Sequence, residues 1–312
     1  MFTPLKSSPK SWLAFELNVL RRMSFDSAAI PFSHNSALGT YLKRWNIRVA
    51  ANDPLQSAWT KSVAAILNNS ERLSAEDVNV VLEDAYVPRY KLHNGGLRDW
   101  FNETDSWWFD NVRQNIDLLP TPVSRAIASC IAMATGDYVL SFNDQTLELR
   151  QPLSNVFRRL WTIEADPVNN GQNNACQNRS AETFLAETAH CELMFLRLPQ
   201  PHTQPLRNSM GKAAWREEWM RGGNDFWHDL DQSFAGKLGS ATETKSQYFK
   251  LLEDVLLTAK HFGKWAIAHV EDGSMSTQEI SEVIGRVRAV DTIYTKDFSE
   301  LTGSKAVIIT AT

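Results

Sequence analysis

The sequence has few cysteines, and it lacks any apolar run long enough to span a membrane. Its three cysteines show no C-x-x-C spacing, and such a sparse, odd set is typical of a reducing compartment rather than of a disulfide framework. The N-terminus also lacks the continuous apolar core of a signal peptide. These absences predict a cytoplasmic protein that has no membrane partner.

An excess of positive charge is missing as well. The 32 Lys and Arg residues are outnumbered by 36 Asp and Glu residues, which gives a net charge of −4. A dedicated nucleic-acid binder is usually basic overall or carries a clear basic stripe, so the total charge argues against strong DNA binding unless a local patch supplies it. The composition is otherwise that of an ordinary globular chain, 43% hydrophobic and 22% charged over 312 residues.

Hydrophobic periodicity predicts an α/β architecture at both ends of the chain. In the first part, apolar strands over 27–32 and 47–51 alternate with helices over 11–23, 36–44 and 56–67, which is the start of a parallel sheet. A buried strand is expected over 191–198. The pattern then returns with a helix over 248–261, a strand over 265–270, a capped helix over 276–285 and two apolar segments, 287–295 and 305–310, that could close the sheet as a hairpin.

The middle of the chain has a different character. Helical stretches over 75–83, 104–118 and 121–133 occur with little strand alternation. Residues 70–150 are therefore expected to form a helical insertion in a domain made of residues 1–69 and 151–312. Residues 165–180 are rich in Asn, Asp and Gly and predict a loop, and residues 203–245 predict a mobile loop with one or two short helices.

The segment from Ile30 to Asp53 has the frame of a nucleotide-cofactor site but lacks its glycines. In an intact site the glycines allow a tight turn and a close approach to the ligand, and an acid about 20 residues further on binds the ribose hydroxyls. Here His34 and Ser36 occupy the expected glycine positions, while Asp53 lies where the acid is expected. A side chain at a position that needs a positive φ costs roughly 1–2 kcal/mol. The frame is therefore typical of an enzyme fold that has lost its enzyme activity.

Several short segments stand in the order and spacing of a known enzyme family. Pro4–Trp12, Pro31–Leu38 and Ala51–Asp53 resemble the motifs P-[FL]-[LV]-K-W-A-G-G-K, P-F-x-G-[SG]-G-A-[LV] and A-N-D of the Dam-type, D12-class DNA adenine N6-methyltransferases. Residues 176–185 resemble that family's N-x-D-[AF]-x-x-[FL], and residues 193–200 resemble its strand that runs into D-P-P-Y. The resemblance implies a Rossmann-like class I methyltransferase sheet in which residues 70–150 form a helical target-recognition insert.

The resemblance also implies where a cofactor and a substrate base would bind. S-adenosylmethionine would be held by residues at the cofactor motifs, namely Lys6, Lys10, Phe32, His34, Ser36 and Asp53. In the family, the acid of D-P-P-Y and a backbone carbonyl accept hydrogen bonds from the adenine amino group, and the aromatic ring stacks on the flipped base. This chain instead has Arg197-Leu198-Pro199-Gln200. Arginine offers only donors, and glutamine has no ring for stacking that is worth roughly 1–3 kcal/mol per base, so no catalytic residue is expected there.

Two functions follow from these matches and departures. The first is a catalytically degenerate relative of the DNA adenine methyltransferases that binds no cofactor. It would act as a nucleic-acid-binding or protein-interaction module, alongside an active methyltransferase subunit if it has a protein partner. The alternative is an active, S-adenosylmethionine-dependent DNA adenine N6-methyltransferase with divergent motifs. Asp53 favours the second function, whereas Arg197, Gln200, His34 and Ser36 favour the first.

Four of these residues also have a purely structural interpretation. Asp53 could be the N-cap of a helix that begins at Pro54. Lys6 and Lys10 could be solvated surface lysines. Arg197, at the carboxyl end of a strand where ligands bind in open α/β sheets, could pair with an acid of the chain or with a phosphate.

Three further clusters have alternative interpretations. His190, Cys191 and His202 could suggest a metal site, but adjacent residues of a strand face opposite ways, so no metal is expected. A basic run interleaved with tryptophans could track phosphates and stack bases, but Glu217 and Glu218 interrupt it and point to a solvated helix face; the run comprises Arg207, Lys212, Trp215, Arg216, Trp219 and Arg221. A tryptophan group could form a partner surface or fill a small core; it comprises Trp100, Trp107 and Trp108.

Overall fold

The computed structural model describes residues 12–143, 145–188 and 190–312. Lys6 and Lys10 lie outside these residues, so their part in a cofactor site stays a prediction. None of the helices in the three described ranges is long and apolar enough to cross a membrane.

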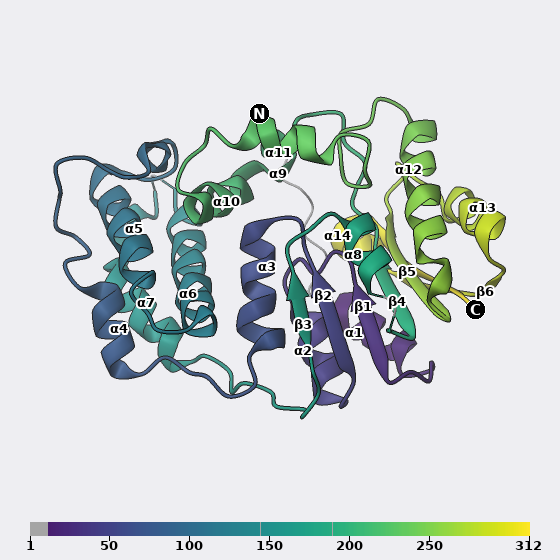
Figure 1. Cartoon of the computed structure of the whole chain (residues 1–312). Coiled ribbons are helices and arrows are strands. Elements are labelled where there is room, and N and C mark those ends of the chain that lie inside the picture. Colours follow the sequence, from purple (N-terminus) through teal and green to yellow (C-terminus); the bar gives the residue numbers. More distant parts are fainter. Residues whose placement is uncertain (1–11, 144, 189) are drawn as a thin grey trace.

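Within the described residues, seven strands form one mostly parallel sheet (Figure 1). They are β1 (Ser27–Ile30), β2 (Arg48–Asn52), β3 (Ala175–Gln177), β4 (Leu193–Arg197), β5 (Lys264–Glu271), β6 (Val290–Asp297) and β7 (Lys305–Ala311). Their order across the sheet is β3-β2-β1-β4-β5-β7-β6. The pairs from β3 to β5 are parallel, and β7 runs antiparallel to both β5 and β6. The mixed α/β architecture and the hairpin at the end of the chain are therefore confirmed.

Helices cover both faces of the sheet (Figure 1). One face packs against α1 (Trp12–Leu20) and α2 (Ala37–Arg44), and the other against α8 (Ala181–Glu187), α12 (Lys245–Thr258) and α13 (Thr277–Val287). Strand alternation produces the two cores: on β4, Met194 and Leu196 join the α12 side, whereas Leu193 and Phe195 join the α1 side. In the chain, β6 and β7 are connected by a short helix, α14 (Ser299–Thr302).

A separate core lies between helices beside the sheet. It joins α4 (Ala75–Leu82), α5 (Glu103–Ile116), α6 (Pro122–Leu140), α7 (Leu153–Thr162) and α10 (Ala214–Arg221). Two elements of this core, α7 and α10, follow residue 150 in the chain, where the predicted insertion ends. The link to the sheet is α3 (Gln56–Ser62), which continues as a π-helical turn over Val63–Leu67 and contacts α6 and α10.

Two segments that were predicted to be irregular contain regular structure. Residues 203–245 hold three helices, α9 (Leu206–Met210), α10 and α11 (Trp227–Phe234), and not one or two. The prediction of a solvated helix face at 215–219 is wrong, because Trp215 and Trp219 are buried in the helical core. The prediction of a loop over 165–180 is wrong at β3, which pairs with β2 through Ala50 and Ala175.

Candidate functional site

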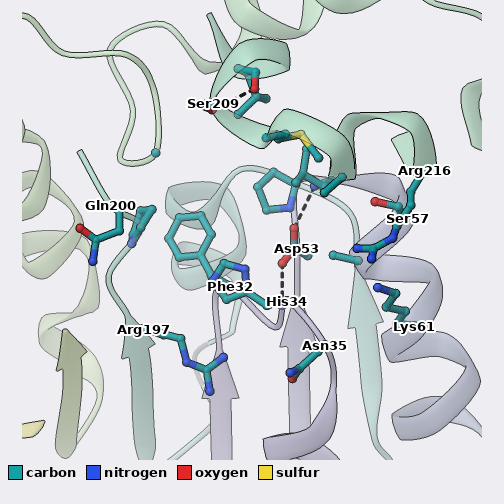
Figure 2. A pocket seen from close by; sticks show the side chains of 18 of the residues that line it. Phe32, His34, Asn35, Asp53, Ser57, Lys61, Arg197, Gln200, Ser209 and Arg216 are labelled. Atoms are coloured by element: carbon teal, nitrogen blue, oxygen red, sulfur yellow. Dashed lines mark hydrogen bonds between the residues drawn. The ribbon is translucent and has the colours of Figure 1, made fainter. Parts of the chain in front are cut away.

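An open cleft of about 950 Å³ lies at the carboxyl ends of β1, β2, β4 and β5. Ligands bind at this edge in open α/β sheets, and the volume falls within the range of about 300–1,000 Å³ that is usual for ligand pockets. Phe32, Asp53 and Arg197 line the cleft from the strand ends, and Lys61 and Arg216 line it from α3 and α10 (Figure 2). The structure therefore brings Phe32, His34, Asp53 and the stretch from Arg197 to Gln200 to one cleft, whereas Ser36 is buried and does not line it.

The loop between β1 and α2 keeps the backbone of a glycine loop without its glycines. His34 has φ 51° and Ser36 has φ 58°, so both lie in the left-handed region that the sequence predicted for these positions. The Ser36 hydroxyl donates to the carbonyl of Asn35 (2.6 Å), and the Ser33 hydroxyl accepts from that of Ser62 (2.8 Å). The His34 side chain faces the open cleft. Its pKa is lowered mainly by the surrounding walls, which withdraw it from bulk water, and further by the positive charges of Arg197 and Lys61.

Asp53 ties this loop to the end of β2. Its side chain is buried, Oδ2 accepts from the backbone N–H of His34 (2.9 Å), and Oδ1 accepts from that of Leu55 (3.0 Å). Burial raises the pKa of Asp53 to about 7, against the lowering by these two hydrogen bonds. The carboxyl group therefore holds the backbone of the loop, and it titrates near neutral pH.

The interpretation of Asp53 as a helix N-cap is wrong. Helix α3 begins at Gln56, and the residue before it, Leu55, makes no side-chain cap. The first amides of α3 instead donate to Glu217 of α10, from Gln56 (2.8 Å) and from Ser57 (2.9 Å). Glu217 is fully buried, so this cap also fixes the helical core against the sheet.

Arg197 at the end of β4 forms a buried ion pair with Glu16 of α1. Its Nε donates to Glu16 Oε1 (2.9 Å), and one terminal nitrogen contacts both carboxylate oxygens (2.7 Å each). The Glu16 side chain is 0% exposed and that of Arg197 is 14% exposed. Burial raises the pKa of Glu16 even though Arg197 lowers it. Of the two partners predicted for Arg197, the structure shows the acid of the chain.

The residues that follow Arg197 also make structural contacts. The Leu198 N–H donates to the carbonyl of Ala268 (2.8 Å), and the carbonyl of Pro199 accepts from the Tyr248 hydroxyl (2.8 Å). Leu198 is buried, whereas Gln200 is partly exposed and lines the cleft. This end of β4 therefore presents an arginine that is already paired and an amide, with neither an acid nor an aromatic ring in the four positions.

The opposite wall contains charged residues that the sequence did not indicate as a site. Arg216 binds Asp137 through Nε (2.8 Å) and one terminal nitrogen (2.6 Å), and the Trp215 indole donates to the same carboxylate (3.2 Å). Lys61 lies close by on α3 (Figure 2). It is partly buried, and among the described residues it has neither a hydrogen bond nor an ion pair. Burial lowers the pKa of Lys61, and the charge of Arg216 lowers it further.

The other predicted clusters are largely structural. Of the basic run, Arg207 pairs with Glu218 (2.7 Å) and Arg221 with Glu217 (2.7 Å). Trp107 and Trp108 are buried, so these two fill the core and do not form a partner surface. In the described part of the chain, no three His, Cys, Asp or Glu side chains gather closely enough to hold a metal ion.

Comparison with known proteins adds no assignment. No protein-family model matches the chain, and no curated protein matches it. The resemblance to the DNA adenine methyltransferases therefore stays a prediction, and the function has to be argued from the cleft.

Proposed function

We propose that this chain is a methyltransferase-fold protein that does not methylate and that binds nucleic acid. The observation that carries the proposal is the Glu16–Arg197 ion pair at the end of β4. A base amino group would need an acceptor there, and the fold supplies a guanidinium that only donates and is already paired. The remaining positions offer no ring on which a flipped base could stack.

The strand order supports the methyltransferase-fold part of this proposal. The final antiparallel strand, β7, is inserted between β5 and β6 beside five parallel strands, as in Rossmann-like class I methyltransferase sheets. The helices α4 to α7 lie between β2 and β3 in the chain, which is the place of the family's target-recognition insert. The three cysteines are free, which supports a reducing, cytoplasmic location.

An exposed loop on the helical part supports nucleic acid as the partner. Tyr86 and Tyr90 are 38% and 102% exposed, and Arg89 and Lys91 beside Tyr90 are exposed as well. Exposed rings stack on bases, and free cations track phosphates, whatever the sequence of the strand. The alternative partner is a protein, such as an active methyltransferase subunit.

Two measurements test the proposal. Transfer of a labelled methyl group from S-adenosylmethionine to adenine-containing DNA should stay at background, whereas DNA binding should weaken steeply as salt is raised. Replacement of Arg89 and Lys91 by Ser should flatten the salt dependence, and the matched replacement of the exposed Lys250 and Lys260 should not. Methyl transfer would overturn the loss of catalysis, and salt-insensitive or absent DNA binding would move the proposal to a protein partner.

The alternative, an active enzyme that binds S-adenosylmethionine, is favoured by one observation. Asp53 lies at the carboxyl end of β2 and lines a cleft that has room for a cofactor. Calorimetric titration with S-adenosylmethionine and S-adenosylhomocysteine separates the two functions. Under the alternative, both ligands bind with micromolar affinity and Asp53→Ala abolishes binding. An affinity that Asp53→Ala leaves unchanged would remove Asp53 from the site.

A further inference from the structure

Lys61 on the α3 wall of the cleft carries a positive charge that the nearby charges of Asp137 and Asp53 offset only in part. Lys61 is partly buried and has no hydrogen bond or ion pair within the described ranges. An unpaired charge that is withdrawn from water is unfavourable, and proteins usually pair such a group or leave it neutral. Burial accordingly lowers the pKa of Lys61, and an anion bound beside the ammonium group would reverse that effect.

The neighbouring acids cannot serve as that anion. Asp137 already accepts from the Trp215 indole and from two nitrogens of Arg216. Asp53 holds two backbone N–H groups, and its raised pKa leaves it partly protonated near neutral pH. Across the cleft, Glu16 is used by Arg197. The unbalanced charge therefore belongs to Lys61.

We propose that Lys61, together with the terminal nitrogen of Arg216 that does not bind Asp137, binds the phosphate group of a nucleotide in this cleft. Lysine acts on phosphate as a point charge, and arginine adds a directed N–H donor. The cleft is much larger than a phosphate ion, and Phe32, Leu55 and Met210 supply apolar surface for the nucleoside part. The inference goes beyond the proposed function, which places nucleic acid on the loop around Tyr90 and assigns no ligand to the cleft. It names a ligand that differs from a methyl donor.

The test compares nucleotides with their nucleosides on the full chain. AMP and UMP are titrated beside adenosine and uridine at low salt, and inorganic phosphate serves as a competitor. We expect each nucleotide to bind about tenfold more tightly than its nucleoside, as one charge-assisted phosphate contact allows. Lys61→Met should bring the nucleotide to the affinity of the nucleoside. Lys250→Met, on an exposed part of α12, should change nothing.

Stability provides a second readout. Because Lys61→Met removes a partly buried, unpaired charge, the ligand-free variant should melt a few degrees above the wild type, but AMP should no longer raise its Tm. A variant that is merely misfolded would melt lower. Lys61→Arg should keep part of the preference for AMP over adenosine.

The source of the phosphate is distinguished with a short single strand. If Lys61→Met weakens both AMP and the strand, the phosphate belongs to nucleic acid; if it weakens AMP alone, the ligand is a free nucleotide. Either result supports the subsite. Equal affinities for AMP and adenosine, or an effect of AMP that survives Lys61→Met, would overturn it. The proposed function would still stand if DNA binding through Arg89 and Lys91 persisted.

Discussion

Removal of one partner of the Glu16–Arg197 pair should destabilise the chain far more than removal of both. Glu16→Met roughly keeps the volume of the side chain but leaves a guanidinium with 14% exposure beside a neutral group. Breaking a buried pair by removing one partner costs about 3–5 kcal/mol. We expect the lower end of that range, because Arg197 borders the cleft and can be reached by water.

Removal of the other partner, Arg197, should lower the free energy of unfolding by an amount that depends on pH. Arg197→Met leaves a fully buried carboxyl group whose pKa, already raised by burial, loses the lowering effect of Arg197. An acid whose pKa is raised in the folded state keeps a proton that the unfolded chain releases above its ordinary pKa of 4.5. The variant should therefore lose stability as pH rises from about 4.5 toward its folded-state pKa.

The double variant Glu16→Met/Arg197→Met should lie close to the wild type. Burial opposes the charge of Glu16 more strongly than Arg197 supports it, so an apolar pair of similar volume gives up little. Urea denaturation of the four proteins gives a double-mutant cycle, in which two single losses of about 3 kcal/mol each and a double variant close to the wild type correspond to a coupling of about 6 kcal/mol. The exposed pair Arg179–Glu187, treated in the same way, should couple by about 0–1 kcal/mol.

Simple additivity would refute this reasoning. If the two single losses sum to the loss of the double variant, the pair is not a coupled buried unit. Arg197 would then be available to a ligand, and the main support for a lost catalytic site would fail.

Three further outcomes are expected from urea denaturation. His34→Gly and Ser36→Gly should each raise the free energy of unfolding by about 1 kcal/mol, because glycine removes the left-handed strain at some entropic expense; unchanged stability would show that the loop is not strained. Stability should fall by up to roughly 4 kcal/mol between about pH 4 and pH 7, because folded Asp53 keeps its proton to about pH 7, and Asp53→Asn should remove this slope. Gly136→Ala should cost about 1–3 kcal/mol, because the added Cβ meets the ring of Trp215, and a neutral result would contradict the tight packing of α6 on α10.

The sheet was predictable because its strands are short apolar runs that the sequence separates clearly. The strands over 27–32, 47–51, 191–198 and 265–270 are each found within two residues of their predicted ends. Strand β3 was missed because it has only three residues, lies at the sheet edge and is set among asparagines. Three residues are too few for the apolar–polar alternation of a strand to be recognised.

The helical core was less predictable, because α10 joins it from the far side of the chain. Charged residues interleave with Trp215 and Trp219, which is the pattern of a surface helix. The charges Glu217 and Glu218 are nevertheless buried. Besides nearby arginines, they bind groups that lie far away in the chain: the amides of α3 for Glu217 and the indole of Trp100 for Glu218. This long-range pairing leaves no local signal in the sequence.

The same limit applies to the site. Asp53, His34 and Arg197 could be found because they stand in a recognisable frame. Lys61 could not be found, because its interest as a site residue depends on the lack of an ion-pair partner in the described part of the fold. That lack can be recognised only when α3, α6 and α10 are placed together. Glu16 did leave a signal: it is a lone acid in the apolar helical stretch over 11–23, which is where a buried charge needs a partner.

Under the proposed function, the two walls of the cleft indicate a change of ligand and not only a loss of activity. On the β4 side, Arg197 stands where the proposed resemblance places an acid, and Glu16 of α1 balances its charge. Because the pair has no net charge, this wall neither accepts a hydrogen bond from the amino group of a base nor attracts an anion. On the α3 side, Lys61 has no such partner among the described residues, because the nearby carboxylates of Asp137 and Asp53 bind other groups. A fold that had only decayed would gain stability by replacing Lys61 with an apolar residue. A rise in stability of Lys61→Met with no loss of any binding would therefore mark the cleft as a remnant, whereas a rise that accompanies the loss of nucleotide binding would mark it as a working site.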